Sequence, residues 1–283
     1  MLKNRAYAVI SDVHGNYKAL EAFLGYCGEH PVDGIICLGD YVTDSPYPER
    51  TMELLRQIRE QYSCYMIRGN RENYLLNNLR ENQGWKPSSQ SGCFYYTSQH
   101  LSDVDMAFFE SLPEEMTVRI EDCPEIFICH GTPGEVRGNV DLNPELKVPA
   151  LQKIEGNYLL GGHSHMQEIF RWNGKTYVNP GSLGLTLDGV GKNAQFVVLH
   201  GDKTGWTPEL CSISYDADAF LEDFTKSGLD ELAFVLNRAV KKTITTGVNY
   251  VIQCVDGVEK ETGCPVSMAS EAVWEKVASG LGV

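Results

Sequence analysis

Short apolar runs alternate with amphipathic helical stretches over the first third of the chain. Residues 6–10 form an apolar run that predicts a buried strand, and Tyr17 to Cys27 carries apolar side chains at helical spacing. The same order recurs twice, with strands at 34–38 and 64–67 and helices at 48–59 and 72–79. Three successive strand–helix units predict a layered α/β fold whose functional residues lie beyond the strand ends.

The pattern changes in the middle of the chain. A polar connection at 83–92 precedes helical spacing over 98–112. After it come short runs typical of strands, at 116–120, 126–129, 158–160, 168–172, 175–178, 194–199 and 209–214. Asn173-Gly174 predicts a two-residue hairpin turn between two of them. We therefore expect a four-layer α/β/β/α sandwich, in which two facing sheets are flanked by helices.

The last part of the chain is predicted to be mainly helical. Apolar residues three and four apart mark helices at 219–224 and 232–240, and a short helix is expected at 272–277. Tyr250-Val251-Ile252 is predicted to form a strand. We divide the chain into a domain at 1–214 and a C-terminal, mainly helical extension at 215–283. Packing against the sheet is the favoured role of the extension, with homo-oligomer formation or covering of a cleft as alternatives.

Charge and cysteine usage restrict the partners and the compartment. The chain has 24 basic and 38 acidic residues, a net charge of −14, and no Lys/Arg run, so extended nucleic acid is not the expected partner. Nine scattered cysteines without a Cys-x-x-Cys spacing fit a reducing, cytoplasmic location. There is no leader-like N-terminus and no apolar stretch of about 18 residues, so no membrane partner is expected.

Metal-ligating side chains stand where five of the predicted strands end. Taken singly, each has an ordinary explanation as a turn residue, a helix cap or a hydrogen-bonded histidine. Together they form a ligand set for two divalent metal ions, for which Mn, Fe, Zn, Ni and Mg all remain candidates. The predicted metal ligands are Asp12, His14, Asp40, Asn70, His130, His163 and His165.

The order of these residues resembles that of the calcineurin-like metallophosphoesterases, in particular the smaller bacterial and archaeal members. Their signature runs Asp-x-His, Gly-Asp, Gly-Asn-x-Asp/Glu, a lone His and Gly-His-x-His, and residues 6–182 contain all five parts, with 178–182 similar to a loop of this branch. The resemblance implies that Asp12, His14 and His165 hold one metal and that Asn70, His130 and His163 hold the other. It further implies that Asp40 bridges the two, and that a metal-bound hydroxide attacks the phosphate.

Two positions depart from the phosphomonoesterases of that family. The expected proton-donating His after Gly-Asn is Arg71, and the Asp expected to orient it is Thr43; Asp44 lies one residue further on. Arginine cannot act as a general acid near neutral pH, but it can hydrogen-bond a phosphate. Arg71 is therefore predicted to bind substrate in a catalytic role beside Asp40 and Asn70, and simple pairing with a local acid such as Glu72 is the alternative.

These observations predict a dinuclear-metal phosphoesterase that acts on a small phosphate-ester substrate. The missing acid favours phosphodiesters or nucleotide-type substrates over phosphomonoesters. A phosphomonoesterase, such as a protein phosphatase or a dinucleoside polyphosphate hydrolase, is the alternative among enzymes. A non-catalytic binding module that keeps its metals as structure is the alternative outside them.

Overall fold

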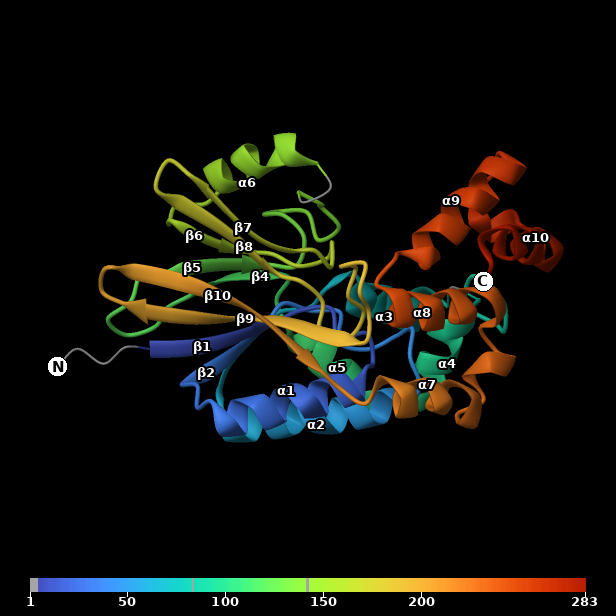
Figure 1. The fold of residues 1–283 in the computed structure, drawn as a ribbon, viewed down its shortest axis with the longest axis horizontal. Helices are drawn as coiled ribbons and strands as arrows, with labels where there is room; N and C mark the ends of the chain where they lie inside the picture. Colours follow the sequence, from blue (N-terminus) through green and yellow to red (C-terminus); the bar gives the residue numbers. More distant parts are fainter. Residues whose placement is uncertain (1–4, 83, 141–142) are drawn as a thin grey trace.

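The computed structural model describes residues 5–82, 84–140 and 143–283, and it contains two five-stranded mixed sheets that face each other (Figure 1). The first sheet has the order β10 (Gly205–Ser214), β9 (Asn193–Asp202), β1 (Arg5–Ile10), β2 (Gly34–Cys37) and β3 (Ser63–Met66). The second has the order β4 (Glu115–Val118), β5 (Ile126–Cys129), β6 (Tyr158–Leu160), β8 (Lys175–Pro180) and β7 (Gln167–Trp172).

The parallel strands of both sheets end at the same edge of the molecule. In the first sheet Ile10 of β1 pairs with Cys37 of β2, which pairs with Met66 of β3. In the second sheet β5, β6 and β8 run parallel in the same way. Because parallel neighbours carry their C-terminal ends together, the loops that follow these strands converge on one edge.

Helices cover the outer face of each sheet, which confirms the predicted four layers (Figure 1). Side chains alternate along β1: Ala8 and Ile10 pack under α1 (Tyr17–Glu29) and α2 (Pro48–Gln61), whereas Tyr7 and Val9 join the core between the sheets. On the opposite side α6 (Lys147–Lys153) packs on the second sheet through Leu151. That helix was not predicted.

The segment predicted as one helical stretch over 98–112 forms parts of two helices. These are α4 (Gly92–His100) and α5 (Asp103–Ser111). The break follows from Ser102, whose hydroxyl caps α5 by accepting a hydrogen bond from the Asp105 N–H, while the Asp105 carboxylate accepts one from the Ser102 N–H. Helix α3 (Asn70–Glu81) begins at the predicted ligand Asn70.

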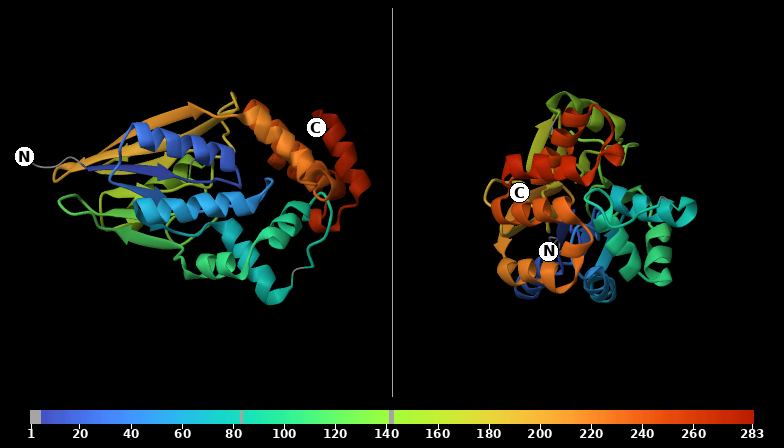
Figure 2. Two further views of the ribbon diagram at one scale, coloured as in Figure 1. Left: turned by 90° about the horizontal axis from the view of Figure 1, so that it is seen from below. Right: turned by 90° about the vertical axis from the view of Figure 1, so that its right-hand side faces the viewer.

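The C-terminal segment is helical, with α7 (Ala217–Lys226), α8 (Phe234–Thr246), α9 (Tyr250–Thr262) and α10 (Glu271–Leu281). Short 3₁₀ turns lie at Pro144–Leu146, Leu229–Glu231 and Val266–Met268. Two views show these helices gathered at the end of the sheets where β1 ends (Figures 1 and 2). None of the helices in the described part of the chain has the length and apolar character needed to cross a bilayer.

The strand predicted at Tyr250-Val251-Ile252 is wrong, because these residues form the first turn of α9. Asn249 caps the helix by accepting a hydrogen bond from the Ile252 N–H at 3.0 Å. Further along, Cys254 and Val258 repeat the helical spacing and are buried against Trp274 of α10. The cap and this tertiary packing outweigh the strand preference of three β-branched and aromatic residues.

Candidate metal centre

The structure brings all seven predicted ligands to one place at the edge of the sheets. Each follows a strand: Asp12 and His14 follow β1, Asp40 follows β2, Asn70 follows β3, His130 follows β5, and His163 and His165 follow β6. Two groups have their ligand atoms within 4.8 Å of one another, and either could hold a metal ion. The first is Asp12, His14 and His165, and the second is Asp40, His130 and His163.

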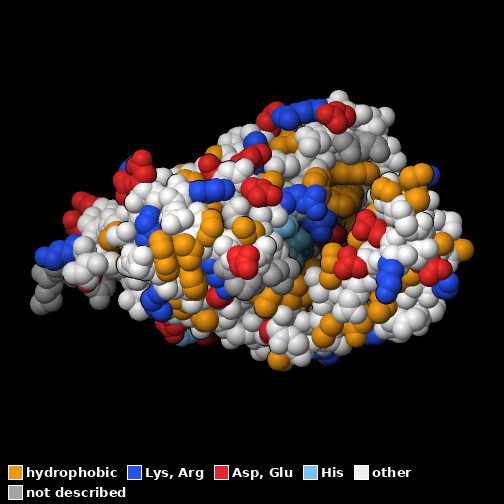
Figure 3. Space-filling view, turned by 90° about the horizontal axis from the view of Figure 1, so that it is seen from above, with side chains coloured by type: hydrophobic (Ala, Val, Ile, Leu, Met, Phe, Trp, Pro, Cys, Tyr) orange, Lys and Arg blue, Asp and Glu red, His pale blue; other side chains and the backbone are white. Residues whose placement is uncertain are grey.

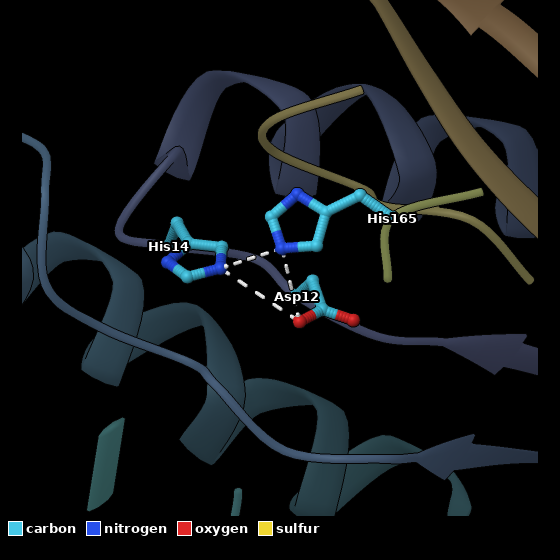
Figure 4. Close-up of side chains that lie close together, drawn as sticks. All are labelled: Asp12, His14 and His165. Atoms are coloured by element: carbon cyan, nitrogen blue, oxygen red, sulfur yellow. Dashed lines mark hydrogen bonds and ion pairs between the residues drawn. The ribbon is translucent and has the colours of Figure 1, made fainter. Parts of the chain in front are cut away.

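In the first group, which Figure 4 shows, the Asp12 carboxylate faces two imidazoles. Asp12 Oδ1 lies 3.7 Å from His14 Nε2 and 3.3 Å from His165 Nε2. This oxygen is buried and accepts no hydrogen bond, whereas Asp12 Oδ2 accepts bonds from the Ser11 hydroxyl and the His163 N–H. A buried carboxylate oxygen without a hydrogen-bond donor is costly, so its position fits a site for a cation.

In three of the histidines the hydrogen bond of Nδ1 determines that Nε2 is the nitrogen available to bind a metal. His130 Nδ1 lies 2.8 Å from the Leu38 carbonyl oxygen, and His165 Nδ1 lies 2.6 Å from that of Leu185. A carbonyl oxygen only accepts hydrogen bonds, so these Nδ1 atoms carry the hydrogen and donate it. In the neutral ring the lone pair is then on Nε2. His14 Nδ1 faces the Asp44 carboxylate at 3.0 Å in the same manner. Such partners are typical of metal-ligating histidines.

With these rings neutral, lone pairs face each other across the site. His14 Nε2 and His165 Nε2 are 3.1 Å apart, and His130 Nε2 lies 3.1 Å from Asn70 Oδ1. Two acceptors at hydrogen-bond distance need a positive species, either a proton or a metal ion, between or beside them. The residues present therefore fit divalent metal ions.

Asp40 lies between the two groups. Its Oδ2 atom is 3.9 Å from His14 Nε2 in one group and 3.4 Å from His130 Nε2 in the other. Its Oδ1 atom accepts a hydrogen bond from the Arg71 backbone N–H at 2.8 Å. One carboxylate thus faces both groups while its second oxygen is held by the start of α3.

The carboxylates strongly shift the pKa values of the imidazoles. Burial by itself lowers the pKa of His130, but Asp40 and Asp12 outweigh it and raise that pKa to about 10. Burial also lowers the pKa of His14, but its hydrogen bonds with Asp12 and Asp44 outweigh burial and raise that pKa to about 9. Burial together with the neighbouring His130 lowers the pKa of His163 to about 4. In the protein alone, protons on His14 and His130 balance the buried carboxylates, and metal binding has to displace those protons.

The backbone at this edge is held in a conformation that most residues avoid. Five of the seven predicted ligands have left-handed φ angles: Asp12 (54°), His14 (48°), Asp40 (55°), His163 (66°) and His165 (60°). Such angles cost free energy in residues other than glycine and persist only where the surroundings enforce them. Their concentration at one site indicates that ligand placement is selected over local backbone stability.

Buried hydrogen bonds enforce this backbone. Glu72, which is fully buried, accepts bonds from the N–H groups of Asp40, Tyr41 and Gly69 at 2.8–2.9 Å. A Cβ atom at Gly69 would lie 2.2 Å from Asp40 Oδ1, so only glycine fits there. The 178–182 loop has a similar role.

Within that loop Asn179 donates to the Gly162 carbonyl oxygen, and the Ser182 hydroxyl donates to the Asp12 carbonyl oxygen. Both side chains are fully buried. The loop therefore holds the backbone on either side of the first group of ligands. We expected it only as part of a family resemblance, and the structure gives it this physical role.

Arg71 pairs with a nearby acid, as the alternative to substrate binding expected, but the acid is Asp44 and not Glu72. Its guanidinium Nη2 lies 3.2 Å from Asp44 Oδ2, and its Nε lies 3.9 Å from Asp40 Oδ2. Asp44 is also the partner of His14, and its Oδ2 accepts a hydrogen bond from the Thr43 hydroxyl at 2.8 Å. Asp44 lies one residue beyond the position at which the family pattern has its Asp, yet the structure places its carboxylate between His14 and Arg71.

A cavity of about 690 Å³ opens over the seven residues, and His14, Asp40, Asn70, His163 and His165 line its floor. Arg71 lines one side with its side chain 22% exposed. The α8–α9 corner also lines the cavity, through Gly247, Val248, Asn249, Val251 and Ile252. In the space-filling view, histidine is visible at the bottom of this hollow, with basic side chains beside it and an apolar rim (Figure 3).

Comparison with known proteins agrees with this geometry. The Calcineurin-like phosphoesterase superfamily domain matches residues 6–204. An uncharacterized protein of Methanocaldococcus jannaschii is 27% identical over 241 residues, which cover 79% of this chain and 93% of that protein.

Two solved structures share the fold. A metallophosphoesterase from Sphaerobacter thermophilus has a TM-score of 0.69 at 22% identity, covering 86% of this chain and 99% of that one. A hypothetical protein from Pyrococcus horikoshii OT3 has a TM-score of 0.72 at 19% identity, covering 86% and 98%.

Proposed function

The chain belongs to the calcineurin-like phosphoesterase superfamily, and we propose that it hydrolyses phosphate esters with two bound divalent cations, preferring phosphodiesters or nucleotide-type substrates. The observation that carries the proposal is the buried, unpartnered Oδ1 of Asp12 facing the Nε2 atoms of two histidines. When bound, two such cations activate a water molecule at neutral pH and neutralise charge on the phosphoryl oxygens.

We assign the ligands by the groups in which they lie. Asp12, His14 and His165 hold one cation, and His130, His163 and Asn70 hold the other. Asp40 would serve both, in keeping with its Oδ2 atom lying within 4 Å of a histidine of each group. The proposed phosphoesterase domain spans 1–214, and 215–283 form an extension that supplies one side of the cleft.

Arg71 binds the phosphate in this proposal. Its backbone N–H already orients Asp40, and Asp44 fixes one side of its guanidinium. The remaining N–H groups of the fork are free to bond phosphoryl oxygens in the cavity that Arg71 lines. A permanently charged guanidinium cannot protonate a departing alkoxide, so leaving groups that depart as stable anions are favoured.

The test compares two chromogenic substrates on protein loaded in turn with Mn, Mg, Ni and Fe. Bis(p-nitrophenyl) phosphate is a diester and p-nitrophenyl phosphate is the matching monoester, and both release p-nitrophenolate. We expect the higher kcat/KM for the diester. Faster turnover of the monoester would contradict the diester preference and leave the enzyme class intact.

Metal content measured on the same samples distinguishes the alternative outside enzymes. Two equivalents of metal per chain without turnover of any phosphate ester in a broad panel would favour a binding module. Turnover that depends on added metal would exclude it.

A further inference from the structure

A second cavity of about 880 Å³ adjoins the metal cavity. The two cavities share Arg71, Arg137, Val251 and Ile252 as lining residues, so they meet along one seam. Arg71 stands at that seam between the metal centre and an aromatic pair. Its guanidinium carbon lies 5.1 Å from the centre of the Phe94 ring, which stacks with Trp85 at 4.9 Å between ring centres.

The second cavity has mainly apolar walls with a few hydrogen-bonding side chains among them. Trp85 and Phe94 form an aromatic wall and are half-buried, and Val251 and Val255 of α9 belong to the apolar lining. Ile252 also lines the cavity, and 47% of its surface is exposed. Lys86, Gln90 and Ser91 interrupt the apolar lining with hydrogen-bonding groups.

Positive charge at the seam is available to a ligand. In the part of the chain that the structure describes, no ion pair joins Arg137 to a carboxylate, and its guanidinium carbon lies 6.0 Å from the centre of the Tyr74 ring. The side chain is exposed on a protein of net charge −14. An arginine without an acidic partner at the junction of two cavities suits an anionic group that reaches from one into the other.

We propose that the second cavity binds the nucleoside of a nucleotide-type phosphodiester whose phosphate lies at the metal centre. The inference rests on the proposed function and names the substrate class of the same cleft. The base lies between the Trp85–Phe94 wall and α9, and Arg137 bonds the phosphate side of the nucleotide. A flat ring with polar edges fits apolar walls that carry the Gln90 amide and the Lys86 ammonium group, whereas an acyl chain would form no hydrogen bond with either.

Two phosphodiesters with the same p-nitrophenolate leaving group test the proposal. One is thymidine 5′-(p-nitrophenyl phosphate), and the other is ethyl p-nitrophenyl phosphate, which lacks the nucleoside. We expect a KM for the thymidine ester roughly tenfold below that for the ethyl ester, as stacking of one base supplies. Trp85→Ala should remove this advantage and leave the KM of the ethyl ester and kcat for both unchanged.

Controls separate a local effect from a folding defect. Trp172→Ala truncates another half-buried tryptophan, which packs on the outer face of the second sheet, and should change neither KM. Should Trp85→Ala fail to fold, Ile252→Ser replaces it, since the Ile252 side chain is largely exposed. Its matched control is Leu210→Ser on β10, where the side chain is 44% exposed. Ile252→Ser should raise the KM of the thymidine ester severalfold.

Calorimetric titration with thymidine 5′-monophosphate gives a readout that needs no turnover. If neither ester is hydrolysed but the wild-type protein binds the nucleotide and Trp85→Ala weakens that binding, the proposed function fails and the nucleoside site stands. If both esters are hydrolysed with equal KM and the nucleotide does not bind, the nucleoside site is refuted and the phosphoesterase stands.

Discussion

The floor of the cleft consists of buried, hydrogen-bonded polar side chains, whereas its far wall consists of partly exposed apolar side chains. At and beneath the floor, Asp12 and His130 are fully buried, their outer atoms are hydrogen-bonded, and five of the ligands have left-handed φ angles. On the far wall, Val248 and Ile252 are apolar and remain 38% and 47% exposed. The floor lies within the family match at 6–204, and the wall comes from α8 and α9, which lie beyond it.

The two sides of the cleft are therefore suited to different tasks. A rigid, polar floor is suited to holding cations and a phosphoryl group in one geometry. An apolar wall with partly exposed side chains is suited to selecting the organic part of a substrate. Changes to the floor should therefore alter the reaction itself, and changes to the wall should alter which ester is preferred.

The largest effect should come from the carboxylate that faces both groups of ligands. Asp40→Asn removes the negative charge shared by the two proposed cations, so we expect loss of bound metal and a fall in kcat of roughly a thousandfold or more. Elemental analysis and steady-state rates on the purified variant measure both. Asp218→Asn, an exposed residue paired with Lys192, is the matched control. Full activity of Asp40→Asn would overturn the metal assignment.

Metal removal tests the floor without a substitution. Dialysis against a chelator should abolish hydrolysis and lower the Tm by several degrees, because ions that bind only the folded state stabilise it by about 2.7 kcal/mol at a hundredfold excess over Kd. Addition of Mn²⁺ should restore both the rate and the Tm. If the chelator changed neither the Tm nor the rate and no metal were lost, the proposed role of the unpartnered Asp12 oxygen as a metal ligand would be contradicted.

A smaller effect should follow from changing a residue that contacts a ligand. Asp44→Asn weakens the bond to His14 Nδ1 and the pairing with Arg71, so we expect metal affinity or kcat to fall about 10- to 100-fold. Metal titrations and initial rates distinguish the two losses. Asp256→Asn removes an equal charge from an exposed position on α9 and should have no effect. An unchanged Asp44→Asn variant would make Asp44 a structural residue only.

Arg71 lies on the side of the cleft between floor and wall. Its substitution should therefore weaken substrate binding without removing the metal ions. Arg71→Ala should raise KM for bis(p-nitrophenyl) phosphate about tenfold while metal content stays constant, since a charge-assisted bond to phosphate is lost. Arg80→Ala on the same helix removes an exposed arginine that pairs with Glu110 and serves as the control. Loss of metal in Arg71→Ala would instead assign the residue to the support of Asp40.

The smallest effect is expected on the wall. Val248→Ser should shift KM only two- to threefold for a bulky diester, because about one partly exposed methyl contact is removed, and metal content should not change. Parallel kinetics on ethyl and thymidine esters give the comparison. A lower metal content in Val248→Ser would show that the wall also supports metal binding, and would contradict the proposed difference between the two sides of the cleft.

Much of the fold and most of the site could be predicted from local patterns. The strand–helix units at 6–79 are read from apolar runs and helical spacing, and their order requires the strand ends to meet at one edge. Ligand types at those ends then predicted seven residues that the structure brings together. The C-terminal part was harder, because Tyr250-Val251-Ile252 has the composition of a strand and becomes helical through the Asn249 cap and contacts with α10.

The side chains that follow the parallel strands could be identified from the sequence alone, because strand direction carries those positions to a common edge. The place of Asp44 and the wall of the cleft depend instead on how distant segments pack together. Asp44 reaches His14 because the loop turns through left-handed angles at Thr43 and Asp44, which no periodic pattern encodes. The wall is formed by α8 and α9, which lie some two hundred residues after Asp40 in the sequence and pack beside it in the fold. Contacts between residues so far apart in sequence arise from the packing of the whole core rather than from local preference.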